Sequence, residues 1–290
     1  MSQSPTAAAN AEMRQYWNEA AGAAWVAQEE ALDRQLESLG ARALARAAIG
    51  SGERVLDVGC GCGTTAIAIA RAVAPGGGVV AVDVSGPMLA RARARARAAA
   101  LGEGIEWMLA DAQTADLGAE RFDCIFSRFG VMFFADPPAA FRNLARALKP
   151  GGRLAFVCWQ GRERNAWMLG PAAAAAQHVA FPPPPPPDAP GPFAFADPAR
   201  VRGILEDGGF AAIAVEAVDE PLRVAGGELD AAVAMCMEVG PVGAALREAQ
   251  ADPEQRRRVL AAVRSCLESF RTPRGLEAPA GAWIVTARRA

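Results

Sequence analysis

Short apolar runs alternate with amphipathic stretches over most of the first 160 residues. The runs that predict buried strands are 54–59, 78–84, 105–111, 122–129 and 153–160. The stretches that repeat apolar residues at helical spacing are 64–74, 86–100 and 137–148. Strands alternating with helices predict a parallel, doubly wound α/β sheet, which binds ligands at the carboxyl ends of its strands.

Both ends of the chain add to this pattern. Residues 11–49 place leucines at helical spacing and predict helices before the first strand. Residues 197–210 predict a helix with Asp197 as its cap. The last two strands are expected at 211–218 and 281–290, and the segment between them is much longer than a hairpin loop. We therefore expect a helical insertion that covers the strand ends.

The pattern predicts a Rossmann-like sheet of seven mainly parallel strands with helical additions. The expected parts are an N-terminal helical lid at 1–50, a ligand-binding core at 51–160, an irregular proline-rich insertion at 161–195, completion of the core at 196–224 and 281–290, and a helical cap at 225–280. Six consecutive prolines, Pro182 to Pro187, predict an extended, exposed loop. A linker is the favoured interpretation of this tract, and a ligand for a proline-binding partner is the alternative.

The turn after the first strand, VLDVGCGCGTT, combines glycines with an acid. Asp57 precedes Gly59, Gly61 and Gly63. A glycine turn between a strand and a helix is typical of dinucleotide sites, where the helix N-terminus receives a pyrophosphate. Here Thr64 replaces the later glycine of that fingerprint, and a carboxylate at the mouth of the turn would repel phosphate. The loop therefore favours a cationic ligand without phosphate, which glycines allow to approach the backbone closely.

These motifs resemble the class I S-adenosylmethionine (SAM)-dependent methyltransferases over about residues 12–160, in particular the ubiquinone/menaquinone-biosynthesis (methyltransferase type 11) group. The ammonium and sulfonium of SAM are cationic and the molecule carries no phosphate, in agreement with the charge of the loop. The resemblance implies a SAM-binding core, a methyltransferase activity and S-adenosyl-L-homocysteine as the product.

The resemblance also implies roles for individual residues. The first motif, which would surround the methionyl part of SAM, comprises Asp57, Gly59, Cys60, Gly61 and Gly63. The other implied cofactor-binding residues are Asp83 for the ribose hydroxyls, Val84 and Met88 for the adenine faces, Asp111 and Ala112 for the adenine amino group, and Ser127 and Arg128 beside donor and acceptor.

The segment YWNEAAGAAWVAQ resembles the same group and contains Tyr16, Trp17 and Trp25. These aromatic residues predict a lid over the sulfonium, because aromatic faces attract cations and exclude water. The alternative is that they hold the first helix against the core. Phe129 and Met132, just after the fourth strand, are further candidates for contact with the substrate.

Methyl transfer from a sulfonium is a one-step displacement that depends on holding both reactants in line in a dry cavity. We therefore name no catalytic residue. We expect a small, largely apolar acceptor, methylated at oxygen, carbon or nitrogen, between the lid and the cap. Met235, Met237 and Val239 offer an apolar surface there. The alternatives are a nucleic-acid or protein methyltransferase and a non-catalytic SAM-binding regulator.

Composition narrows these alternatives. The net charge of −2 and pI near 5.7 argue against a nucleic-acid partner, and the arginines at 91–97 favour a solvated helix face over a phosphate site. Six scattered cysteines without a CxxC pair predict neither a metal site nor a disulfide framework. We find no signal peptide or spanning segment and expect a cytoplasmic protein that binds no membrane. The single histidine, His178, is a weak candidate base. The oligomeric state is not predicted.

Overall fold

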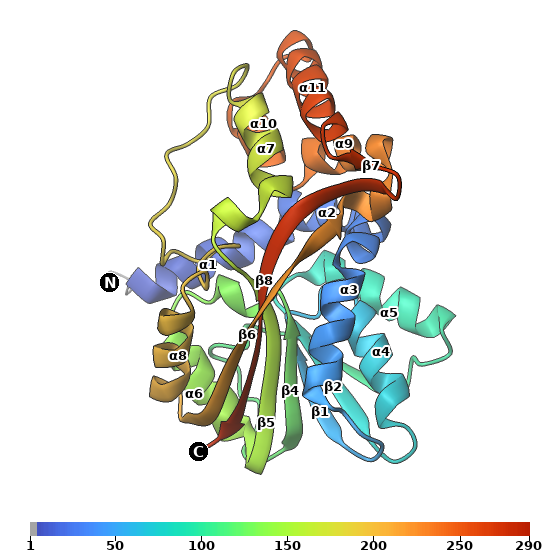
Figure 1. Ribbon diagram of the computed structural model, residues 1–290. Helices are drawn as coiled ribbons and strands as arrows, with labels where there is room; N and C mark the ends of the chain where they lie inside the picture. The colour runs from blue at the N-terminus through green and yellow to red at the C-terminus, as the bar shows by residue number, and fades with distance from the viewer. Residues whose placement is uncertain (1–4) are drawn as a thin grey trace.

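The computed structural model describes residues 5–290, with side chains at 10–19 and 21–290. The main sheet has the strand order β3-β2-β1-β4-β5-β8-β6 (Figure 1). Its strands are β1 (Arg54–Val58), β2 (Gly78–Asp83), β3 (Ile105–Leu109), β4 (Phe122–Arg128), β5 (Leu148–Trp159), β6 (Phe210–Arg223) and β8 (Gly275–Arg289), and a short β7 (Arg271–Thr272) pairs with β8. The strands from β3 to β5 pair in parallel, and β8 runs antiparallel to both β5 and β6. The predicted seven-stranded, mainly parallel Rossmann-like sheet is confirmed.

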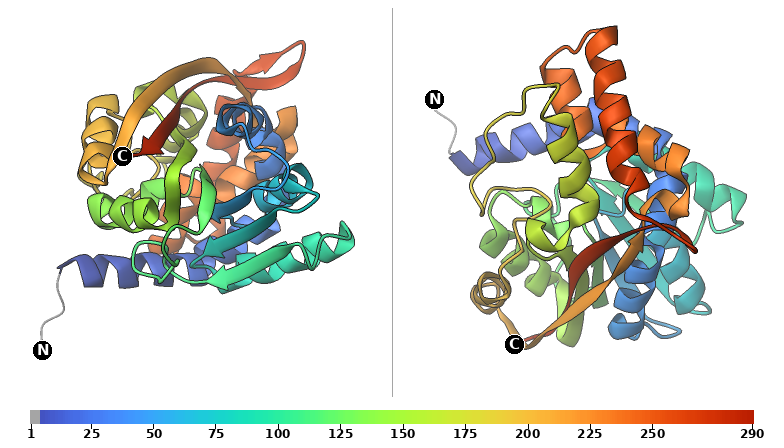
Figure 2. Two further views of the ribbon diagram at one scale, coloured as in Figure 1. Left: turned by 90° about the horizontal axis from the view of Figure 1, so that it is seen from below. Right: turned by 45° about the horizontal axis from the view of Figure 1, so that its top comes forward.

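Helices cover both faces of the sheet, which is why its strands read as continuous apolar runs. One face carries α3 (Glu29–Ala47), α4 (Thr64–Val73) and α5 (Gly86–Ala98), and the other carries α6 (Pro137–Ala147) and α8 (Pro198–Asp207) (Figures 1 and 2). The largest buried side chains between these layers include Phe122, Phe126 and Phe156 from β4 and β5. Because helices pack on both faces of the sheet, the positions of the strand ends are fixed.

Side-chain caps begin several of these helices where the sequence predicts. Asp136 accepts a hydrogen bond of 3.0 Å from the Ala139 amide ahead of α6, and Asp197 accepts one of 2.8 Å from the Ala199 amide ahead of α8. Both caps are followed by proline in the first turn. The segment that begins at Asp136 is therefore a helix start in this structure.

The N-terminal helices α1 (Pro5–Asn18) and α2 (Ala20–Ala27) lie between the sheet and a helical cap (Figure 1). The cap is formed by α7 (Ala166–Ala175), α9 (Leu229–Glu238), α10 (Gly240–Glu248) and α11 (Pro253–Glu268), which share a second apolar cluster. Short 3-10 turns are η1 (Val131–Phe133), η2 (Arg162–Arg164) and η3 (Val224–Gly227). The segment 225–280 contains α9, α10 and α11 together with β7 and the start of β8.

Two expectations about the second half need correction. The segment 161–195 is not irregular throughout, because α7 forms within it and packs against α11 of the cap. The strands β6 and β8 are longer than the predicted 211–218 and 281–290. Their pairing extends to Arg223 opposite Glu277, so the two strands reach into the cap. Pro182 to Pro187 are all exposed, as expected, and their role stays a prediction. The division of the chain into domains also stays a prediction.

Among residues 5–290, no individual helix has the length and apolar character needed to cross a membrane. Only α9 and α10 taken together reach that length and composition, and they bend by 46° at the break between them.

Candidate functional site

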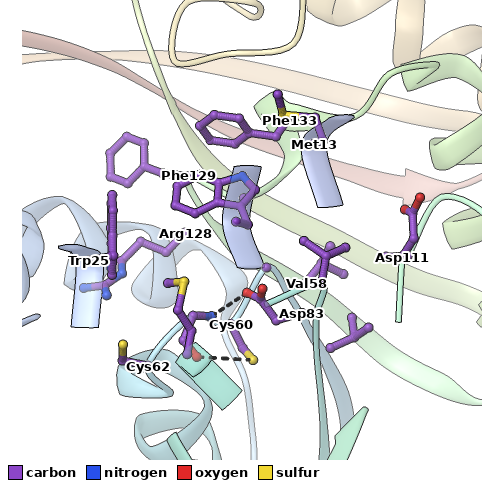
Figure 3. Close-up of a pocket in the computed structure, with 18 of the residues that line it drawn as sticks. Met13, Trp25, Val58, Cys60, Cys62, Asp83, Asp111, Arg128, Phe129 and Phe133 are labelled. Atoms are coloured by element: carbon purple, nitrogen blue, oxygen red, sulfur yellow. Dashed lines mark hydrogen bonds between the residues drawn. The ribbon is translucent and has the colours of Figure 1, made fainter. Parts of the chain in front are cut away.

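Two adjoining cavities lie at the carboxyl ends of the parallel strands. The first, here called the loop cavity, has a volume of about 130 Å³ and is lined by the turns after β1, β2, β3 and β4 and by α1 to α3 (Figure 3). The second, the cap cavity, has a volume of about 330 Å³ and is lined by α1, α2, α7, α9, α10 and the loop at 190–192. The sheet places the first cavity, and the helical insertion builds the second.

Most of the residues predicted to bind a cofactor line the loop cavity. They are Gly59, Cys60, Gly61, Asp83, Val84, Met88, Asp111, Ala112 and Arg128. Asp57, Gly63 and Ser127 do not line it and lie behind its wall. The sequence therefore located the cavity, but it did not separate the residues that face a ligand from those that hold the loop.

The glycine turn after β1 is shaped by close backbone contacts. Gly59 has φ +66°, and a Cβ there would lie 2.8 Å from the Gly130 Cα. Gly61 has φ +55°, and a Cβ there would lie 3.0 Å from the Met88 methyl carbon at the cavity wall. The left-handed backbone disfavours other residues at both positions, and side chains would narrow the cavity.

Asp83 joins this turn to the end of β2. Its Oδ2 accepts a hydrogen bond of 2.8 Å from the Gly61 amide, and its Oδ1 accepts one of 2.9 Å from the Ser85 amide. Burial raises the pKa of Asp83, and the hydrogen bonds from the Ser85 and Gly61 amides oppose the rise. The carboxylate is nevertheless part of the cavity wall (Figure 3), so its remaining lone pairs can accept hydrogen bonds from a ligand.

Asp111 lies on the side of the loop cavity away from Trp25 and Arg128 (Figure 3). Its Oδ1 accepts from the Gln113 amide at 2.9 Å, and its Oδ2 accepts from the Asn10 side-chain amide at 2.9 Å. Asn10 belongs to α1, so the N-terminal helix is tied directly to the wall of the cavity.

Asp57 was expected at the mouth of the glycine turn, and the structure corrects this. The side chain is fully buried, and its Oδ2 accepts a hydrogen bond of 2.6 Å from Thr65 Oγ1. Its Oδ1 has no hydrogen-bond partner among the described residues. Thr65 itself lines the cavity, so Asp57 acts on the site through Thr65 and through its charge.

Burial raises the pKa of Asp57 to about 7, while Thr65 and Arg128 oppose the rise and Asp83 adds to it. This folded-state pKa is above that of an unfolded aspartate, about 3.9. The folded protein therefore holds the Asp57 proton more tightly, and the stability that this contributes is lost as pH rises from about 4 to about 7.

We predict that Asp57→Asn removes this part of the pH dependence. The asparagine cannot ionise, so the variant should gain stability relative to the wild type as pH rises through that window. Denaturant unfolding of both ligand-free proteins at a series of pH values measures the difference. Parallel stability curves for the two proteins would show that Asp57 has an ordinary pKa.

Ser127 and Gly63 also do not line the loop cavity, but they fix the backbone behind its lining. The Ser127 hydroxyl donates to the Val58 carbonyl at 2.8 Å and accepts from the Gly130 amide at 3.2 Å, which fixes the end of β4 beside β1. Gly63 precedes α4, and a Cβ there would lie 2.9 Å from the Ala92 Cβ.

Two acidic residues of α3 complete the charged part of the loop cavity, and the sequence reasoning missed both. Glu29 and Asp33 line the cavity together with Arg128. Asp33 Oδ1 accepts from Arg128 Nη2 at 2.9 Å, and Thr64 Oγ1 donates to Asp33 Oδ2 at 2.6 Å. The available signal was their spacing of four residues on one helix face, in line with the buried Leu36.

The same acids correct the interpretation of the arginine repeat on α5. Arg91 forms a two-pronged ion pair with Glu29, and Arg95 lies 2.9 Å from Asp33 and donates to the Cys62 carbonyl at 3.1 Å. These two arginines therefore join α5 to α3 and the glycine turn, and are not only a solvated face.

Mainly aromatic side chains line the junction of the two cavities. The side chains that line both are Met13, Trp17, Trp25, Leu36, Phe129 and Phe133. Figure 3 shows four of them, Met13, Trp25, Phe129 and Phe133, around the loop cavity. The Trp17 ring lies edge-on to Trp25 at 5.7 Å and to Phe133 at 5.2 Å between centroids. None of these shared side chains is ionisable, so the junction is apolar.

The lid helix that carries Trp17 is fastened to the β2–α5 turn. Asn18 donates to the Val84 carbonyl at 2.8 Å and accepts from the Gly86 amide at 2.9 Å. Ser85 Oγ donates to the Trp17 carbonyl at 2.7 Å. The aromatic residues thus both line the cavities and hold α1 in place, and their effect on a sulfonium stays a prediction.

The cap cavity lies where the sequence placed an acceptor pocket, between the lid and the insertion. Tyr16 and Met132 line it, as do Met235 and Val239, whereas Met237 is buried in the cap and does not. His178 lines neither cavity, which removes the basis for its interpretation as a base.

No group of three or more His, Cys, Asp or Glu side chains in the described part of the chain could hold a metal ion. Cys60 and Cys62 are buried free thiols in the glycine turn, and burial raises the pKa of Cys62 to about 12. Both are small neutral side chains of the loop wall at neutral pH.

Comparison with known proteins finds a family model that matches the core of the chain. Residues 55–152 match the family model described as a methyltransferase domain. A stretch of 107 residues, 37% of this chain, is 31% identical to an uncharacterised protein of Mycobacterium tuberculosis and covers 37% of it. A stretch of 53 residues, 18% of this chain, is 40% identical to the ubiquinone/menaquinone biosynthesis C-methyltransferase UbiE of Pseudomonas putida and covers 21% of it. The matches span well under half of either relative.

The fold extends further than the sequence similarity. The structure of the YcgJ protein from Bacillus subtilis superposes with a TM-score of 0.55 at 16% identity, over 87% of this chain and 98% of that one. At this identity the likeness shows a shared fold. Residues 55–152 of this chain, with their glycine turn and strand-end acids, are a class I SAM-dependent methyltransferase domain with distant similarity to UbiE.

Proposed function

We propose that this protein binds SAM in the loop cavity and transfers its methyl group to a small, largely apolar acceptor in the cap cavity. One observation carries the proposal: the two cavities share an apolar wall, so molecules bound in them would meet there. The domain family supports the cofactor, and the lining of the second cavity supports the acceptor class.

The residues present fit SAM. Glu29 and Asp33 line the methionyl end of the cavity beside Arg128, so this end offers carboxylates to an ammonium and a sulfonium. Arg128 would hold the methionyl carboxylate. Gly61 has no side chain, so the space beside Met88 that a Cβ would fill is left open for the ligand.

The other end of the cavity fits a nucleoside. Asp83 would accept hydrogen bonds from the ribose hydroxyls, and Asp111 would accept one from the adenine amino group. Val84, Met88 and Ala112 supply apolar contacts for the adenine ring.

SAM supplies an electrophilic methyl group on a good leaving group. The protein then has to position the acceptor and exclude water, because the reaction is a single in-line displacement. Trp17, Trp25 and Phe129 perform both tasks at the junction, and their ring faces favour a cationic sulfonium. No side chain at the junction is suited to remove a proton, so we infer an acceptor that is nucleophilic as it binds or that ionises in solution.

The acceptor class follows from the walls of the cap cavity. Four tryptophans line it, Trp17, Trp25, Trp159 and Trp167, together with methionines and prolines. Such a surface binds flat or extended apolar molecules. The similar UbiE is named for ubiquinone and menaquinone biosynthesis, which agrees with an acceptor of this kind.

The test is incubation with methyl-labelled SAM and a panel of phenols, quinols, amines, RNA, DNA and unrelated proteins. We expect label in at least one small aromatic or apolar acceptor and none in the macromolecules. Label in nucleic acid or protein alone would overturn the acceptor class, and SAM binding without any transfer would favour a regulator.

A further inference from the structure

The cap cavity has a mainly apolar lining that includes one arginine. Its charged or hydroxyl-bearing lining side chains are Tyr16, Glu238 and Arg247. Arg247 belongs to α10 and is half-buried, whereas Glu238, at the end of α9, is exposed. Arg247 is therefore the less exposed of the two charged residues that line the cavity.

Arg247 differs in its partners from Arg128 and Arg153, two arginines that join helices to the sheet. Arg128 and Arg153 each pair with a carboxylate, at 2.9 Å from Asp33 and 2.7 Å from Glu53. Arg247 Nη1 donates to the Glu238 carbonyl at 2.8 Å, and within the described part of the chain no carboxylate lies within salt-bridge distance of it. The remaining guanidinium donors are available to another acceptor.

The charge of Arg247 acts on the neighbouring wall of the cavity. Tyr16 is 40% exposed, and partial burial raises the pKa of its hydroxyl while Arg247 opposes that rise, so the guanidinium favours negative charge near Tyr16. A guanidinium beside a hydroxyl donor matches a planar anion, because arginine binds carboxylates through two parallel hydrogen bonds.

We propose that Arg247 selects acceptors that carry a carboxylate, or a similar planar anion, on an apolar aromatic body. This inference rests on the proposed function, in which the cap cavity holds the acceptor. The tryptophan and methionine walls bind the body, and Arg247 with Tyr16 binds the anionic group. A cationic acceptor is disfavoured, because Glu238, the acid that could bind it, is solvated and its attraction is screened.

Equilibrium binding tests the proposal without requiring methyl transfer. The probes are hydroxynaphthoate and its neutral carboxamide. Each is added to the 290-residue chain in the presence of S-adenosylhomocysteine, and binding is followed by quenching of tryptophan fluorescence. We expect the wild type to bind the carboxylate about 10-fold or more tightly than the carboxamide. Arg247→Met should weaken binding of the carboxylate by about 10- to 100-fold and change the affinity for the carboxamide by no more than about 2-fold. Arg247→Lys should fall between them.

Arg257→Met is the matched control, because Arg257 lies on the exposed face of α11, pairs with Glu254 and lines neither cavity. It should bind both probes as the wild type does. Equal weakening of both probes in Arg247→Met would show that Arg247 only braces α9 through the Glu238 carbonyl, and would overturn the proposal. Equal wild-type affinity for both probes would overturn it too.

The methyl-transfer assay separates this inference from the proposed function. Efficient methylation of neutral acceptors with no preference for anionic ones would leave the proposed function intact and overturn the role of Arg247. Selective binding of the carboxylate without methylation of any acceptor would support the anion site and count against the proposed function.

Discussion

Ala24→Trp will abolish methyl transfer and leave SAM binding almost unchanged. Ala24 is on α2 and lines the cap cavity but not the loop cavity. An indole at this position fills space that the acceptor needs, and a displaced acceptor loses its in-line approach. We expect kcat/KM to fall at least about 100-fold, while the SAM dissociation constant from calorimetry changes by no more than about 2-fold.

Ala23→Trp provides the matched control, because Ala23 is the preceding residue of the same helix, is exposed and lines neither cavity. It should retain both activity and SAM affinity. Wild-type turnover by Ala24→Trp would place the acceptor outside the cap cavity. Loss of SAM binding together with turnover would show that the two cavities do not act as separate sites.

Asp83→Ala will weaken SAM binding by at least about 100-fold. The substitution removes the acceptor for the Gly61 and Ser85 amides, and it removes the carboxylate that we expect to bind the ribose. Hydrogen bonds to a charged group contribute about 1.5–3 kcal/mol each, so the loss of the ribose contacts alone accounts for a large part of this effect. Calorimetry with SAM measures it.

Asp116→Ala tests whether such a loss is specific to the site. Like Asp83, Asp116 accepts a hydrogen bond from the amide two residues later, here from Gly118 at 3.1 Å. Its side chain is 85% exposed and lines neither cavity. The variant should bind SAM as the wild type does. If Asp83→Ala also bound SAM normally, Asp83 would serve only to shape the loop.

The parallel sheet and the glycine turn were predictable because their signals are local. Strands covered on both faces must be apolar along their whole length, and the strand–glycine–helix order is contained in about ten consecutive residues. The acid at the end of β2 was found for the same reason, since Asp83 directly follows an apolar run. These local signals were enough to locate the loop cavity.

Contacts between distant segments were not predictable in this way. Glu29 and Asp33 reach the cavity because α3 packs beside α5, and only the fold brings them to Arg91 and Arg95. Asp57 illustrates the opposite case: its place in the motif was clear, but its burial depends on Thr65 and the adjacent strands. Helix α7 was missed because alanines surround Pro171 and give little periodicity.

Calorimetric titration of the wild-type protein with SAM, S-adenosylhomocysteine and NAD tests the central claim most directly. The acids around the glycine turn should favour the cationic nucleoside, so we predict binding of SAM and S-adenosylhomocysteine and no measurable binding of NAD. Tight binding of NAD with no response to SAM would contradict the account.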